Sequence, residues 1–170
     1  ASFPFHPELI KVLDSKLSTI PNFQRTRGAL RLLAHVIRGL WEKRESGVFV
    51  IHLHGVDLAR PEIAQELTSR LDRSAFESVI RADIAAAPGA LAAHAQRTDT
   101  ESGAPHPYAE RAATAIFLHS LTAGVPGVPL AELLASVLTP GDDPAVVHRL
   151  IGKLEEAAWY LDTSAASYRF

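Results

Sequence analysis

Apolar side chains recur every three or four residues along most of this chain, which is the spacing of amphipathic α-helices. In the first such segment Leu9, Leu13 and Leu17 share one helical face. Together with prolines at helix starts and breakers at helix ends, the pattern predicts helices over residues 6–20, 24–45, 74–86, 88–96, 108–123, 130–138 and 144–158. It predicts a further helix that is capped by Asp57, has Pro61 in its first turn and extends to Leu71. The sequence therefore predicts a mainly α fold.

Two segments depart from helical spacing. Residues 48–53 are β-branched and aromatic, which predicts an extended segment. Near the end of the chain, residues 159–162 and 166–170 are aromatic-rich and flank a small polar turn, which predicts a β-hairpin. Three helices followed by a hairpin is the element order of a winged helix, so we expect a winged-helix-like part at this end.

A change in composition divides the chain. Residues 97–107 are polar and rich in residues that break helices. We therefore predict a helical domain over residues 1–97, a linker over residues 98–107 and a winged-helix-like domain over residues 108–170. A chain of 170 residues is long enough for one medium domain or two small ones.

Composition and charge narrow the classes of function. A formal net charge of -2 argues against a dedicated nucleic-acid binder. The absence of cysteine excludes disulfides and thiolate metal sites, and it permits a reducing compartment. No apolar run approaches the roughly 20 residues that span a bilayer, so we expect a cytoplasmic protein with no membrane partner. The chain starts at Ala1 and contains no methionine, so we expect a piece of a longer protein.

The densest group of candidate functional residues opens the second predicted helix. Arg25, Arg27 and Arg31 lie within seven residues around Gly28. Arg27 and Arg31 are four residues apart and share a helical face, and the start of a helix favours anions. These arginines can therefore meet a phosphate or a carboxylate. The alternative is a solvated basic turn on a surface helix.

Histidines give weaker signals. His52 and His54 alternate along the predicted extended segment with Asp57 nearby, but no further clustered ligand completes a three- or four-ligand set, so no metal site is predicted. His119 lies in an apolar helix and is interpreted as a hydrogen-bonded core or boundary residue.

The C-terminal part offers a DNA-binding alternative. Its candidate DNA-contacting residues are His148, Arg149, Lys153 and Arg169. Acidic residues surround them, including Glu155 and Glu156, whereas a recognition helix normally carries more positive charge. We therefore favour packing against protein over DNA binding for this part.

The residues from Gly28 to Arg31, at a helix start, resemble the sensor-2 motif of AAA+ ATPase lid domains. The wider pattern is similar to the family catalogued as domain of unknown function 499, whose members are large AAA+-like ATPases often found in phage-defence loci. The similarity is carried by residues 5–9, 23–34, 115–121 and 168–170.

The resemblance implies a helical AAA+ lid-like part followed by the winged-helix-like part. It implies that Arg31 reaches the terminal phosphates of a nucleotide, with Arg25 and Arg27 as helpers. It also implies ATP and magnesium as cofactors of the parent protein, none for the fragment, and the parent's upstream ATPase core and neighbouring subunits as partners. A phosphate-binding loop, Gly-x-x-x-x-Gly-Lys-Ser/Thr, does not occur in the sequence, so we expect a non-catalytic fragment. The alternatives are a DNA-binding module and a protein-interaction scaffold.

Overall fold

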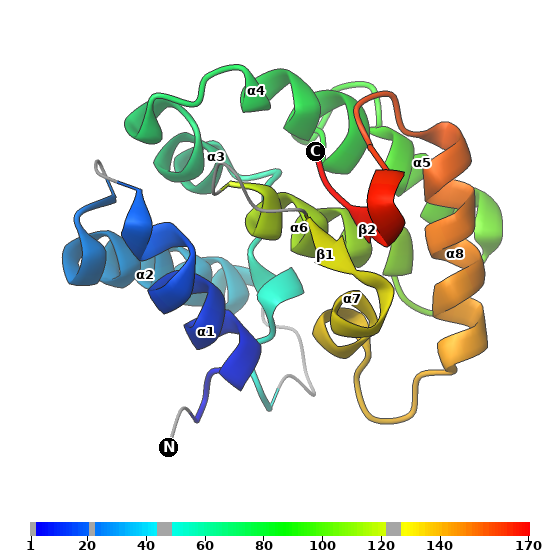
Figure 1. The fold of residues 1–170 in the computed structure, drawn as a ribbon, viewed down its shortest axis with the longest axis horizontal. Helices are drawn as coiled ribbons and strands as arrows, with labels where there is room; N and C mark the ends of the chain where they lie inside the picture. Colours follow the sequence, from blue (N-terminus) through cyan, green and yellow to red (C-terminus); the bar gives the residue numbers. More distant parts are fainter. Residues whose placement is uncertain (1–2, 21–22, 44–48, 122–126) are drawn as a thin grey trace.

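The structure is a computed structural model that describes residues 3–20, 23–43, 49–121 and 127–170. It is mainly helical, as predicted, with one small antiparallel sheet (Figure 1). The helices are α1 (Pro7–Ser15), α2 (Arg25–Lys43), α3 (Pro61–Leu67), α4 (Phe76–Val79), α5 (His94–Ser102), α6 (Tyr108–Ser120), α7 (Leu130–Val137) and α8 (Pro144–Ala157). Short helical turns follow α1 at Leu17–Thr19, α3 at Ser69–Leu71 and α4 at Ile80–Ile84, and isolated ones occupy Leu53–Gly55 and Ser164–Ala166. None of these helices is long and apolar enough to cross a membrane.

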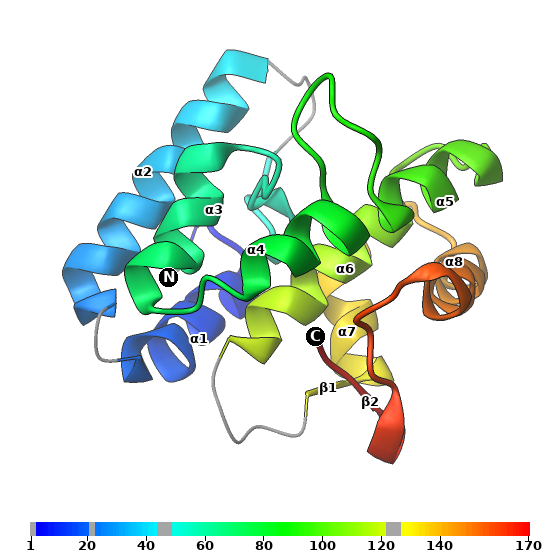
Figure 2. The same ribbon diagram turned by 90° about the horizontal axis from the view of Figure 1, so that it is seen from above.

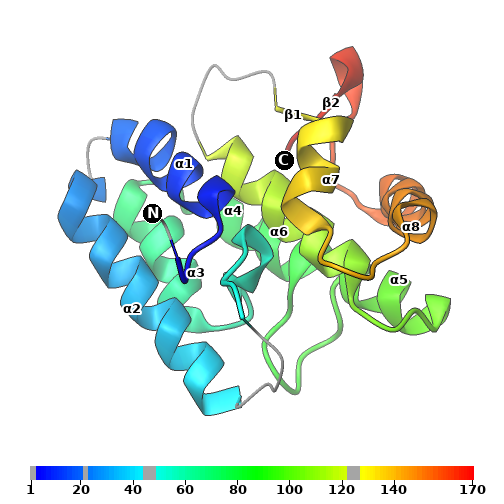
Figure 3. The ribbon, with the colours of Figure 1, turned by 90° about the horizontal axis from the view of Figure 1, so that it is seen from below.

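Helix α6 is the centre of the core. Its residues 112–119 are all buried, because α5, α7, α8 and the turn Leu53–Gly55 pack around it. Figures 2 and 3 show α6 near the middle of the molecule, with α1, α2 and α3 on one side and α5 and α8 on the other. Alanines at positions 112, 113 and 115 let these neighbours approach closely.

The N-terminal half matches the predicted helices in most places, but Asp57 does not cap α3, which starts at Pro61 after Arg60. Helix α2 buries Leu32 and Val36 against α3 and the Leu17–Thr19 turn. In the predicted extended segment, Ile51 forms a parallel bridge with Phe5. Residues 44–45 and 48, and the predicted helix end at 122–123, lie outside the described residues.

The predicted helix over residues 88–96 is wrong for most of its length, and residues 98–102, the first half of the predicted linker over residues 98–107, are helical. Residues 85–93 are not helical, and Gly89 there has a left-handed φ of 86°. Helix α5 occupies His94–Ser102 instead, and the Asp99 carboxylate accepts hydrogen bonds of 2.8 Å from the backbone N–H groups of Ala109 and Glu110. These bonds tie α5 to the first turn of α6. The polar composition of residues 97–107 therefore reflects the exposed side of α5 and the capping of α6 by Asp99.

The buried hydrophobic residues form one cluster that runs from Leu9 to Leu154. The cluster crosses the predicted boundary, since α5 packs on α6 and α8 as well as on the Ile80–Ile84 turn. The described residues therefore share one core on both sides of residues 98–107.

The C-terminal hairpin is present in part. Asp162 and Arg169 pair through two backbone hydrogen bonds of 2.8 and 3.0 Å. The two-stranded sheet, however, joins β2 (Ser167–Tyr168) to β1 (Val128–Pro129), which precedes α7. Gly127 has a left-handed φ of 94°, and a Cβ there would lie 2.5 Å from the backbone oxygen of Tyr168. A glycine at this position lets the two strands meet.

Candidate functional site

The arginine predicted to contact a phosphate is held by a buried carboxylate. Arg31 of α2 places Nε at 3.2 Å and Nη2 at 3.1 Å from Oε2 of Glu66 on α3. The Glu66 side chain is only 5% exposed, and its other oxygen lies 3.1 Å from Nη1 of Arg70. One carboxylate thus neutralises part of the charge of two guanidinium groups, and it links α2 to α3. Sequence spacing did not predict this partner, because 35 residues separate Arg31 from Glu66.

The other predicted residues of the arginine cluster are placed differently from Arg31, which pairs with Glu66. Arg25 opens α2, and the Arg27 side chain is exposed one turn before Arg31. Gly28 is buried, and a Cβ there would lie 1.8 Å from the backbone oxygen of Phe23. The turn into α2 therefore requires a glycine at position 28. This packing requirement explains the glycine, and no bound ligand is needed to explain it.

The outer face of α2 is apolar. Leu30, Ala34, Ile37 and Trp41 follow one another at intervals of four, three and four residues, and all four side chains are exposed. We call these four residues the α2 stripe. At helical spacing, Arg27, Arg31 and Arg38 lie along one edge of the α2 stripe. An amphipathic helix would normally place polar residues here, so this face has the composition of a contact surface.

A cleft with a volume of about 1000 Å³ lies between α2, residues 49–57 and the start of α6. Its ionisable lining groups are Lys43, His52, His54, Asp57, His106, Glu110 and Arg111. The imidazoles of His52 and His54 stack at 5.0 Å, whereas the Asp57 carboxylate pairs with Lys43 at 2.9 Å. His54 Nδ1 donates to the Ser136 carbonyl oxygen at 3.2 Å, and burial lowers the pKa of His54 to about 3. His54 is therefore neutral at pH 7.

Glu110 gives the cleft a pH dependence. Burial raises the pKa of Glu110 to about 7, and the carboxylates of Asp57 and Asp99 act in the same direction. An ordinary glutamate in the unfolded chain ionises near pH 4.5. Because the folded state holds this proton more tightly, the contribution of Glu110 to stability is present below about pH 4.5 and is lost as the pH rises to about 7.

The variant Glu110→Gln is expected to remove this loss. At pH 8 the free energy of unfolding of this variant should exceed that of the unaltered chain by about 1–3 kcal/mol, whereas at pH 4.5 the two values should be similar. Urea unfolding at both pH values measures the difference, and Glu101→Gln on the exposed face of α5 is the control. Parallel stability curves for Glu110→Gln and the unaltered chain would contradict the assignment.

The predicted DNA-contacting residues lie on the C-terminal part. His148, Arg149 and Lys153 are exposed on α8. Arg169, unlike these three residues, forms an ion pair: its guanidinium contacts the Asp162 carboxylate at 2.8 and 2.9 Å. Glu155 and Glu156 are exposed near the end of α8, and Glu155 accepts a hydrogen bond from the Tyr168 hydroxyl at 2.9 Å.

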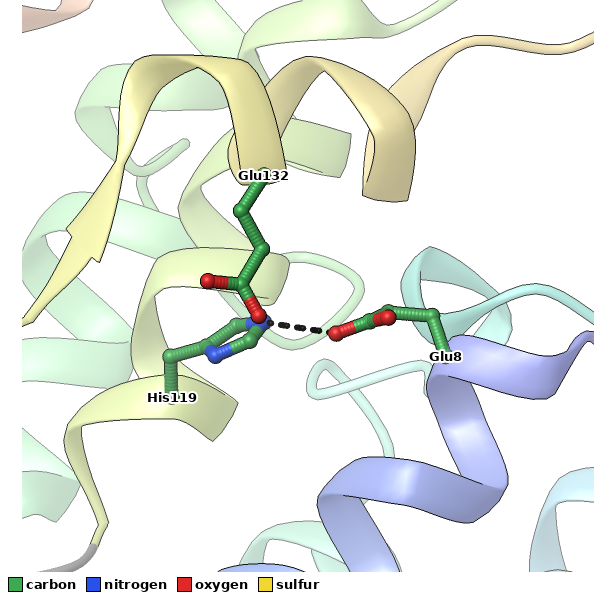
Figure 4. Close-up of side chains that lie close together, drawn as sticks. All are labelled: Glu8, His119 and Glu132. Atoms are coloured by element: carbon green, nitrogen blue, oxygen red, sulfur yellow. Dashed lines mark ion pairs between the residues drawn. The ribbon is translucent and has the colours of Figure 1, made fainter.

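A further group of ionisable side chains lies where α1, α6 and α7 meet (Figure 4). One ligand atom each from Glu8, His119 and Glu132 lies within 4.8 Å of the other two. His119 is fully buried, as the sequence predicted, and Lys16 Nζ lies 2.6 Å from its Nδ1. Sequence spacing did not predict this group, because its members come from three helices that are distant along the chain.

The family model described as DUF499 second domain matches residues 1–135. The match covers more than half of the chain, and the chain belongs to this family, as its motifs had indicated. No curated protein and no solved structure matches the chain.

Proposed function

We propose that this chain is a non-catalytic helical module of a larger AAA+-like ATP-binding protein, and that the α2 stripe docks on the nucleotide-binding core of that protein. The observation that carries the proposal is the exposed apolar stripe with arginines along its edge. The family description as a second domain supports an occupant from the same polypeptide, since it implies another domain. ATP and magnesium are then cofactors of that core.

In this proposal Arg31 acts as a sensor-2-type residue. Its side chain is 32% exposed while it contacts Glu66, so a phosphate at the edge of α2 can compete for the guanidinium. Arg70 would stay on Glu66 during that exchange, so the buried carboxylate would keep a cationic partner. Arg27 adds positive charge at the same end of α2, whereas the side chain of Arg25 lies outside the described part of the structure.

The C-terminal part supplies a winged-helix-like packing module in the same proposal. The order α6, β1, α7, α8 and β2, with β1 paired to β2, agrees with that architecture. DNA binding through α8 is the alternative that the exposed His148, Arg149 and Lys153 favour. The pairing of Arg169 with Asp162 and the acidic end of α8 favour protein contact.

The proposal is tested in the full-length protein by ATP turnover. Arg31→Ala is expected to reduce turnover at least about tenfold, because it removes a cation from the phosphates. Trp41→Glu is expected to reduce it as well, because a charge in the α2 stripe opposes docking.

Each variant has a matched control. Arg97→Ala removes an exposed arginine of α5 and leaves both Glu66 and the edge of the α2 stripe intact. Leu91→Glu alters a side chain that is 83% exposed, against 80% for Trp41, on a loop outside α2. Both controls should turn over ATP nearly normally. Equal losses in Arg31→Ala and Arg97→Ala would show that the loss of any surface arginine lowers turnover, and normal turnover in Arg31→Ala would refute the sensor role.

A further inference from the structure

The junction of α1, α6 and α7 holds a second candidate site that needs no nucleotide. Among the residues that the structure describes, Glu8, His119 and Glu132 are the set of three histidine or carboxylate side chains whose ligand atoms lie within 4.8 Å of one another. We propose that Glu8, His119 and Glu132 bind a divalent transition-metal ion, with Zn²⁺ as the best match.

His119 provides the observation that points to a ligand. The residue is 0% exposed, and its Nε2 atom has no hydrogen-bond partner among the described residues. The nearest carboxylate oxygen, Oε1 of Glu8, lies 3.9 Å away, which is too long for a hydrogen bond. Figure 4 shows this nitrogen directed toward the carboxylates of Glu8 and Glu132. A buried polar atom without a partner is costly, and a bound ion would satisfy it.

The donor set selects the kind of ion. One imidazole nitrogen and two carboxylate oxygens suit Zn²⁺, which binds nitrogen and oxygen at about 2.0–2.2 Å and leaves a fourth position for water. Magnesium and calcium prefer sets made of oxygen alone. The two glutamate side chains are partly exposed, so they can rotate to close the 4.8 Å spread around an ion.

Lys11 competes for the position between the carboxylates. Its Nζ lies 2.8 Å from Oε1 of Glu132 and 3.3 Å from Oε1 of Glu8. The Lys11 side chain is 56% exposed, so it can turn into solvent when a divalent ion takes over both carboxylates. Removal of this ammonium group should therefore tighten metal binding.

Lys16 sets the tautomer of His119. In its ammonium form Lys16 donates to Nδ1 of His119, which leaves the imidazole proton on Nε2. A metal ion can bind Nε2 only when that nitrogen carries no proton, so Lys16 must turn away and the imidazole proton must move to Nδ1.

The experiment is a titration of the chain with Zn²⁺ by calorimetry and with Co²⁺ by visible absorption. The unaltered chain should bind one ion and unfold at a higher temperature in its presence. Glu132→Gln, which keeps the side-chain volume at a partly exposed position, should weaken binding by about tenfold to a hundredfold. Lys11→Met should strengthen it, and Glu156→Gln on α8 should leave it unchanged.

The outcomes separate the proposal from simple ion pairing. If the cluster only pairs Lys11 with its two carboxylates, Lys11→Met lowers stability and no variant binds the ion. Absence of binding by the unaltered chain would overturn the proposal, and so would equal binding by Glu132→Gln and Glu156→Gln. Because both probes are used without ATP, failure here leaves the proposed role of α2 untouched.

Discussion

Replacing Asp83 with alanine is expected to lower the free energy of unfolding by about 3–5 kcal/mol. Asp83 is fully buried and accepts three hydrogen bonds. The donors are Nδ1 of His94 at 2.7 Å and the backbone N–H groups of Trp159 at 3.0 Å and Tyr160 at 2.7 Å. Alanine would remove the acceptor of all three donors, of which the His94 imidazole is buried. Urea unfolding followed by circular dichroism measures the loss.

Two further variants define what Asp83 contributes. Asp83→Asn keeps the volume and one acceptor oxygen, so its loss should be smaller than that of Asp83→Ala. Asp14→Ala alters an exposed aspartate of α1 and should stay within about 0.5 kcal/mol of the unaltered chain. If Asp83→Ala also stays within about 1 kcal/mol, the carboxylate does not hold α5 and the segment after α8 together.

The second large effect is expected at Gly28, where Gly28→Ala should destabilise the fold by about 3 kcal/mol. The added Cβ would lie 1.8 Å from the backbone oxygen of Phe23, so the turn into α2 must open. Gln24 in this turn already has a positive φ of 58°, which limits how the backbone can adjust. Thermal and urea unfolding both report the change.

Gly152 is the matched control for Gly28. It also lies in a helix, α8, but nothing lies within 4 Å of a Cβ built there. Alanine favours the helical conformation over glycine, so Gly152→Ala should stabilise the chain by about 0.5–1 kcal/mol. The two substitutions thus have opposite expected signs. A loss at Gly152 as large as that at Gly28 would mean that helical glycines in general, and not the contact with Phe23, set the cost.

The sequence predicted the helices whose apolar faces meet the core. In α8, for example, the buried residues Val147, Leu150 and Leu154 have helical spacing, and Asp143 caps the helix start by accepting from the Ala145 N–H. Helix α5 was missed because its sequence is polar and only one side packs, through His94, Ala95 and Thr98. Composition marked that segment as a linker, whereas tertiary contacts make it a helix.

The sequence predicted candidate site residues that are close along the chain, but it did not predict their long-range contacts. The arginines of α2 were visible as a cluster, but the Glu66 carboxylate that holds Arg31 was not. The pairing of β1 with β2 was missed as well, because the two residues of β1 give no strand pattern on their own. Local spacing determines which side chains share a helix face, and it carries no information about which helices meet.

The pairing of β1 with β2 shows that the residues matched by the family model are fewer than the residues that fold together. The family match stops at residue 135, inside α7, whereas β2 and α8 follow it. Helix α6 lies within the match but is buried on one side by α8, so the residues beyond 135 complete its environment. A chain cut at residue 135, where the family match ends, would therefore lose α8 and expose the side of α6 that α8 covers.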